Sequence, residues 1–120
     1  MSNIKAAKCD NYVDKHRLPY ALYSDETLIG FAMIGAYNAE EKYIWLDRFM
    51  IDEIFQGKGH SKPLLNKLLM MIKEKWNPDI IVLSIDPTNE KALYLYEKIG
   101  FRINGMIDPN NGEKLMEYKA

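Results

Sequence analysis

Hydrophobic residues recur along the chain with two spacings, one typical of helices and one typical of strands. From Gly59 to Trp76 apolar residues recur at helical spacing, at Leu64, Leu65, Leu68, Leu69, Ile72 and Trp76. Pro63 falls in the first turn, where a helix does not need its N–H group. The run DIIVLSI that follows is almost entirely apolar, which is typical of a strand buried on both faces. A second helix is predicted within NEKALYLYEKIGF, capped by Asn89 or Thr88 and ended by Gly100.

The first half of the chain is predicted to be mostly strand. Tyr20 to Tyr23 forms a short strand, and a polar turn from Ser24 to Glu26 leads into a second strand from Leu28 to Tyr37. A third strand, rich in β-branched and aromatic residues, runs from Tyr43 to Ile51. The segment from about Asn3 to Lys15 is weakly helical and mostly polar. Near the other end, FRINGMIDPNNGEKLMEY predicts two strands around the turn PNNG.

The order of these elements indicates the fold class. A strand, a helix and a further strand in succession predict a right-handed parallel crossover. We therefore expect a mixed α/β sheet with at least two helices. A single domain spanning residues 1–120 is expected, because 120 residues bury one core but not two.

Charge and cysteine content exclude several classes of function. Sixteen basic and seventeen acidic residues give a net charge of −1, so no overall field favours nucleic acid or a membrane surface. No apolar run approaches the roughly 18 residues of a membrane span, and the first residues, MSNIKAAKCDN, lack the apolar core of a signal peptide. A single Cys9 and the lack of Cys/His zinc spacing favour a metal-free protein of the reducing cytoplasm, in which Cys9 acts as a small hydrophobe.

The stretch IDEIFQGKGHSKPLL joins the third strand to the first helix and is the strongest candidate for a binding site. A glycine turn that ends at a helix start favours an anion, because the first helical N–H groups have no partner and carry the positive end of the dipole. The segment lacks both the Walker pattern GxxxxGK[ST] and the Rossmann pattern GxGxxG. Taken alone, the turn is equally compatible with a structural role for its glycines.

Two motifs in the right order resemble those of the GNAT family of N-acetyltransferases. The family's pyrophosphate loop begins with Arg or Gln, has Gly at its fourth position and ends in Gly or Ala; here Gln56 and Gly59 match, and Ser61 is a small departure. The second motif, N-x-x-A-x-x-x-Y-E-K-x-G-F, runs from Asn89 to Phe101. The phrases WLDRF, IDE, QGKG and NGEK make the chain most similar to the bacterial spermine/spermidine acetyltransferase branch.

The resemblance covers about Leu22 to the C-terminus and implies both a fold and a ligand. The implied fold is a mostly antiparallel sheet with a central, splayed parallel strand pair, helices on both faces and a shortened N-terminal part without the first strand and helix. The implied ligand is acetyl-coenzyme A, with no metal. Its pantetheine arm is expected along the backbone of Phe49, Met50 and Ile51 and near Asn89 and Tyr96. The pyrophosphate is expected at Gln56 and at the amides of Gly57, Lys58, Gly59, His60 and Ser61.

The chemistry of acetyl transfer suggests roles for particular residues. An alkylamine has a pKa near ~10.4, so a base must accept its proton at neutral pH. Asp47, on the third strand, is the candidate, although a salt bridge to Arg48 or a lysine would equally explain it. The backbone N–H of Met50 or Ile51 would stabilise the oxyanion if the strands splay.

A tyrosine of pKa near ~10 can protonate a departing thiolate of pKa about 8.5, and Tyr96 is the candidate for this acid. The neighbouring Tyr94 is the rival, and an aromatic at helical spacing is usually part of the core. His60 is expected to point to solvent or phosphate rather than to act as a base, and His16 has no motif around it. Lys58 and Lys62 either contact phosphate or form a solvated face.

Two functions from different classes follow. The first is an N-acetyltransferase acting on a primary amine, with a polyamine such as spermidine or spermine attracted by the acidic residues Asp47, Asp52, Glu53, Glu40 and Glu41. The second is a reduced module that binds acetyl-coenzyme A as a sensor or interaction domain and transfers little. In both cases the sheet edge left exposed by the missing first strand predicts a homo-oligomer, formed by strand pairing or swapping, with a dimer as the expected form.

Overall fold

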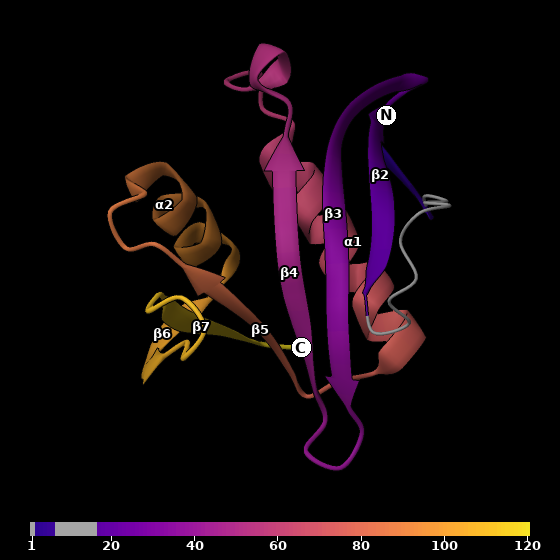
Figure 1. The fold of residues 1–120 in the computed structure, drawn as a ribbon. Helices are drawn as coiled ribbons and strands as arrows, with labels where there is room; N and C mark the ends of the chain where they lie inside the picture. Colours follow the sequence, from indigo (N-terminus) through magenta and orange to yellow (C-terminus); the bar gives the residue numbers. More distant parts are fainter. Residues whose placement is uncertain (1, 7–16) are drawn as a thin grey trace.

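The sheet of this protein has seven strands in the order β1-β2-β3-β4-β5-β7-β6, and two α-helices pack against it (Figure 1). The computed structural model describes residues 2–6 and 17–120. The strands are β1 (Ser2–Ala6), β2 (Leu18–Ser24), β3 (Thr27–Asn38), β4 (Tyr43–Ile51), β5 (Ile80–Ile85), β6 (Arg102–Ile107) and β7 (Lys114–Lys119). The helices are α1 (Ser61–Trp76), α2 (Glu90–Ile99) and a short 3₁₀ turn η1 (Glu53–Phe55).

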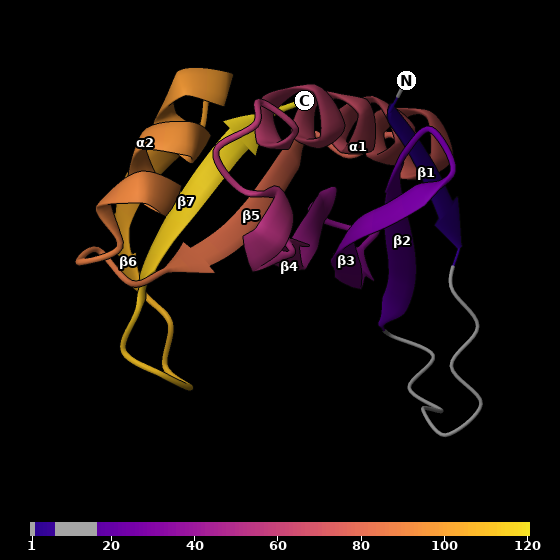
Figure 2. The same cartoon turned by 90° about the horizontal axis from the view of Figure 1, so that it is seen from above.

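Both α-helices lie on the same face of the sheet. α1 connects β4 to its parallel neighbour β5, and α2 connects β5 to β6, which runs in the same direction as β5 because both are antiparallel to β7. Two right-handed crossovers that advance the same way along a sheet put their helices on one side of it, as Figure 2 shows. The expectation of helices on both faces is therefore wrong for the part of the chain that the structure describes.

The core lies between this face and the helices. Five side chains of α1 are buried there: Leu64, Leu65, Leu68, Leu69 and Ile72. They pack with Ile44 and Leu46 of β4, and with Ile81 and Leu83 of β5. The helix predicted from apolar spacing is thus confirmed, with its first residue at Ser61 rather than near Gly59.

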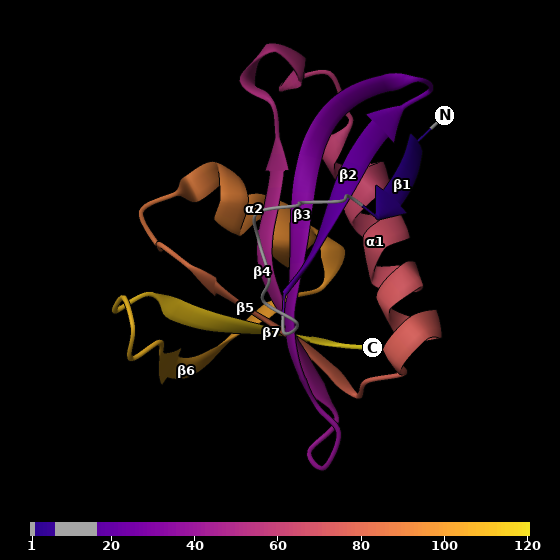
Figure 3. The same cartoon turned by 45° about the vertical axis from the view of Figure 1, so that its right-hand side comes forward.

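β4 and β5 are paired only at their beginnings and then part. Their register covers Tyr43 with Ile80, Ile44 with Ile81 and Trp45 with Val82. Beyond this point β4 stays with β3 as far as Ile51, whereas β5 stays with β7 as far as Ile85. Figures 1 and 3 show the two strands diverging, and we call this parting of β4 from β5 the splay. The predicted parallel, splayed pair is confirmed.

The N-terminal segment differs from the prediction. Residues 2–6 form β1, which pairs antiparallel with β2 and packs Ile4 against the core, so neither the helix expected from Asn3 nor the loss of a first strand is correct there. A weak helical tendency over five residues is outweighed by hydrogen bonding to the open edge of β2. The rest of the predicted helix, with Cys9 and His16, lies outside the described residues. The other predicted strands, the hairpin turn and α2 are confirmed.

Candidate active site

β4 contains a β-bulge at Asp47, in the middle of the strand. Met33 of β3 lies opposite Arg48, but the next residue, Ile34, lies opposite Leu46, which makes Asp47 the extra residue of β4. Ile44 and Leu46, before the bulge, belong to the core, and the next residue of β4 that packs against the core is Phe49, three positions after Leu46. Asp47 therefore lies on the face opposite the helices, because it directly follows an inward residue.

The carboxylate of Asp47 lies directly over the backbone of Gly35 in β3. A Cβ atom added to Gly35 would stand 2.5 Å from Oδ2 of Asp47 and 2.7 Å from both Cγ and Oδ1. Nε of Arg17 is 3.5 Å from the same Oδ2, with side-chain exposures of 52% for Arg17 and 27% for Asp47. The structure contains a salt bridge of Asp47 to Arg17, where the sequence suggested Arg48 or a lysine as the partner. The Asp47 side chain thus remains partly exposed to solvent.

The backbone direction of β4 distinguishes between the two candidate oxyanion donors. Asp52 donates its N–H to the carbonyl oxygen of Ile29 in β3 at 2.7 Å. In an antiparallel pair every second residue directs both its N–H and its carbonyl oxygen to the partner strand, so Met50, two residues before Asp52, also faces β3. The position of its carbonyl oxygen against Gly30 of β3 agrees with this. Ile51 directs its N–H to the opposite side, toward the splay. The geometry favours Ile51 over Met50, and Phe49 shares its direction.

The loop after β4 presents helix N–H groups without a side-chain cap. Gly57 and Gly59 have φ angles of 77° and 80°, and a Cβ on either would meet nothing within 4 Å, so backbone conformation requires these glycines. The side chain of His60 makes no capping hydrogen bond, and the first turn of α1 has no acidic residue. Nε2 of Gln56 donates to the carbonyl oxygen of Ile51 at 2.8 Å and ties the loop to the end of β4. This donor set suits a pyrophosphate.

The remaining loop residues fall into two groups by exposure. Lys58 and Lys62 are exposed, whereas His60 and Ser61 are partly buried where the loop meets α1. Both lysines thus remain compatible with phosphate contact and with a solvated face.

α2 carries the predicted acid on the helix side of the sheet. Asn89 caps this helix, since its Oδ1 accepts the N–H of Ala92 at 3.2 Å. The Tyr96 ring packs edge-on against Phe101, with 5.5 Å between ring centroids and 69° between ring planes. Burial raises the pKa of Tyr96 to about 12, so its hydroxyl stays protonated at neutral pH. Its rival Tyr94 is 68% exposed, which fits a surface position.

Comparison with known proteins identifies the family. A model described as the acetyltransferase (GNAT) family matches residues 3–101. The chain belongs to this family. The spermine/spermidine N(1)-acetyltransferase of Bacillus subtilis (strain 168) is 44% identical to this GNAT chain over 103 residues, which cover 82% of this chain and 67% of that protein. The chain thus spans about two thirds of the length of that relative.

Solved GNAT structures share the fold. A mutant form of the spermidine N-acetyltransferase SpeG of Vibrio cholerae has a TM-score of 0.82 at 19% identity, covering 98% of this chain and 93% of that chain. The same enzyme in complex with CoA and spermine has a TM-score of 0.73 at 22% identity, covering 88% and 65%. At these identities the likeness supports the GNAT fold alone, and it confirms the predicted fold class.

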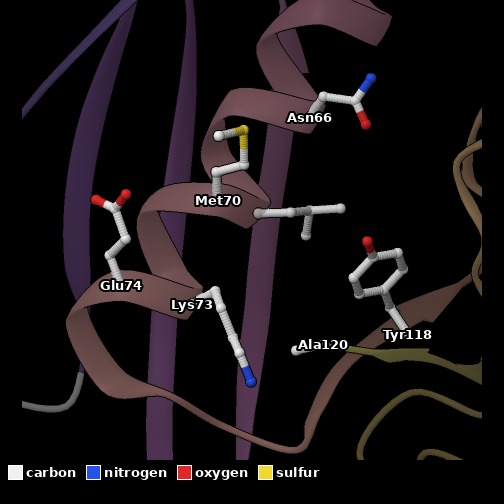
Figure 4. A pocket seen from close by; sticks show the side chains of 7 residues that line it. Asn66, Met70, Lys73, Glu74, Tyr118 and Ala120 are labelled. Atoms are coloured by element: carbon white, nitrogen blue, oxygen red, sulfur yellow. The ribbon is translucent and has the colours of Figure 1, made fainter.

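A cavity of about 380 Å³ lies away from the site residues of β4, the loop that follows it and α2 (Figure 4). It is formed by the middle and C-terminal part of α1, the end of β7 and the last residue of the chain, and its lining residues are Asn66, Leu69, Met70, Lys73, Glu74, Tyr118 and Ala120. None of the predicted site residues lines it. Among the residues that the structure describes, no group of His, Cys, Asp or Glu could hold a metal ion, and no helix is long and apolar enough to cross a membrane.

Two residues of the site were missed from the sequence. Gly35 stands within an apolar strand, where a glycine signals a bulge or a close approach, and this signal was available. The spacing of three, rather than two, between the apolar residues Leu46 and Phe49 could likewise have located the bulge, because an extra residue shifts the alternation of inward and outward side chains. Arg17 had no such signal, because its contact with Asp47 depends on how distant strands pair.

Proposed function

We propose that this chain is an N-acetyltransferase that moves the acetyl group of acetyl-coenzyme A to a primary amine of a polyamine such as spermidine or spermine. GNAT membership supports the reaction class, and the Bacillus relative, a spermine/spermidine acetyltransferase, supports the acceptor. The observation that carries the proposal is the position of Asp47, an accessible carboxylate at a bulge of β4 beside the splay. It lies where an amine can approach from the face without helices.

The cofactor-binding role is assigned to the loop and to β4. The uncapped N–H groups at the start of α1, together with the open backbone at Gly57 and Gly59, would hold the pyrophosphate of acetyl-coenzyme A. The backbone of Phe49 and Ile51 faces the splay and would hold the pantetheine arm. When bound, the coenzyme supplies a thioester, whose carbonyl carbon is open to attack by a neutral amine.

Three groups of the chain then share the proton and charge transfers. Asp47 accepts the amine proton, directly or through water, which keeps the attacking nitrogen neutral. The N–H of Ile51 stabilises the negative charge that develops on the carbonyl oxygen. The hydroxyl of Tyr96 donates its proton toward the departing sulfur, and solvent restores the phenol afterwards.

The acidic residues expected to attract a polycation flank β4 at both ends. Asp52 and Glu53 follow its last residue, whereas Glu40 and Glu41 stand in the β3–β4 turn. Six residues separate Glu41 from Asp47, or roughly 20 Å of extended chain at about 3.3 Å per residue. Asp52, five residues beyond Asp47, is roughly 17 Å away by the same measure. Both distances exceed the Debye length of about 8 Å at physiological salt, so neither acidic pair contributes much at Asp47 itself.

The proposal is tested by incubating the purified chain with acetyl-coenzyme A and spermidine and following the release of free thiol. We expect amine-dependent release, and Asp47→Asn should lower kcat/KM for spermidine by about 100-fold, in the range for a lost general base. Glu40→Gln, an exposed change in the β3–β4 turn, is the matched control. Thermal stabilisation by acetyl-coenzyme A without thiol release for any of a panel of amines would instead identify a cofactor-binding module.

A further inference from the structure

Gly35 differs from the loop glycines in what it requires. Gly57 and Gly59 have positive φ angles and empty space around them, so their backbone conformation explains them. Gly35 has no positive φ angle, and its backbone would accept any residue. What it lacks is room, because the carboxyl carbon and both carboxylate oxygens of Asp47 lie within 2.7 Å of where its Cβ would stand.

The close approach of the Asp47 carboxylate to Gly35 occurs on the face of the sheet that carries no helices. Asp47 is the extra residue of the bulge in β4, and the pairing of β3 with β4 shifts again between Ile34 and Tyr37, so Gly35 lies within this second irregularity, next to the bulge. A bulge re-aims a side chain but does not by itself fix where its end lies. Here the carboxylate lies over Gly35 on one side and meets the guanidinium of Arg17 on the other.

We propose that Gly35 is a positioning residue for the acetyl transfer: its missing side chain provides the space in which the Asp47 carboxylate lies, and so sets where that carboxylate meets the amine. The inference rests on the proposed function, in which Asp47 accepts the amine proton. A methyl group at position 35 would displace the end of a flexible side chain rather than backbone. Gly35→Ala should therefore fold normally but hold the base in the wrong place.

The decisive experiment is a double-mutant cycle between positions 35 and 47. In the chain with Asp47, Gly35→Ala should lower kcat for spermidine about 10- to 100-fold, as expected for a catalytic group displaced by about 1 Å, with the KM for acetyl-coenzyme A unchanged. In the Asp47→Ala background, the same substitution should change kcat less than about two-fold, because no carboxylate remains to be displaced. Ala36→Ser, at the exposed neighbouring position of β3, should retain wild-type kcat.

An equal loss of kcat in both backgrounds would overturn the proposal, because it would mean that Gly35 acts through the strand and not through Asp47. A second measurement does not need activity: the carboxyl carbon of Asp47 is titrated by NMR in the wild type and in Gly35→Ala, and assigned with Asp47→Ala. Different titration curves support the displacement, whereas superimposable curves refute it. If the wild type transfers acetyl to no amine, the proposed function fails, and this titration still decides whether Gly35 positions the carboxylate.

Discussion

Replacing Tyr96 by Phe tests the assigned acid with little risk to the fold. The substitution removes one hydroxyl and keeps the ring that packs edge-on against Phe101 at 5.5 Å. General acids contribute about 10²- to 10⁴-fold to a rate. With a pKa of about 12, Tyr96 is a weaker acid than a thiol of pKa about 8.5, which places its contribution at the lower end. We therefore expect kcat to fall about 100-fold, or about 2.7 kcal/mol in the barrier.

The assay is steady-state thiol release at saturating acetyl-coenzyme A and spermidine, with the Kd for the coenzyme measured separately. Tyr94→Phe is the matched control, because Tyr94 stands on the same helix, is 68% exposed and should keep full activity. The raised pKa also fixes the sign of the pH dependence: Tyr96 keeps its proton until the pH approaches 12, so it adds no alkaline decline in rate below about pH 11. A Tyr96→Phe variant with wild-type kcat would remove Tyr96 as the acid.

Three further outcomes are expected. Gly59→Ala should weaken binding of acetyl-coenzyme A and destabilise the chain by about 1–2 kcal/mol, since a left-handed φ is costly for alanine; an unchanged Kd by calorimetry would contradict the loop assignment. Asn89→Ala should cost about 1 kcal/mol of stability in urea unfolding by removing the cap of α2, whereas Asn89→Asp should keep the cap. A loss of coenzyme affinity in Asn89→Asp, in which the helix remains capped, would indicate that the amide also contacts the ligand. Because β1 covers the edge of β2 from which a dimer was expected, self-association would have to use the outer edge of β1 or of β6. Light scattering that shows only monomer at high concentration would refute the expected dimer.

Local patterns were sufficient for most of the fold. The spacing of leucines predicted α1, and the buried run DIIVLSI predicted β5, because burial on one face or on two leaves a distinct periodicity. The cap at Asn89 and the stop at Gly100 placed α2, since both depend on backbone groups of the same helix. These features are decided within a few residues of sequence.

The features that the sequence did not predict depend on pairing between strands that are distant along the chain. Residues 2–6 became a strand because β2 offered an open edge, and a short polar segment carries no pattern that records such a partner. The same limit applies to the site: the loop could be located from its glycines, but the contact of Asp47 with Arg17 and Gly35 depends on the register of three strands. The choice of Ile51 over Met50 also required the hydrogen-bond ladder.

The two candidate catalytic side chains, Asp47 and Tyr96, come from opposite faces of one sheet, so the proposed reaction requires an opening between the strands, which the splay provides. Asp47 lies on the face without helices, whereas Tyr96 belongs to α2 on the helix face. A continuous ladder between β4 and β5 would separate them by hydrogen-bonded backbone. Pairing stops after Trp45 and Val82, so in the proposed reaction an amine beside Asp47 and a thioester held in the splay would meet at the N–H of Ile51. The short parallel pairing at the start of β4 thus joins the two halves of the sheet, and its early end leaves the opening that the proposed reaction requires.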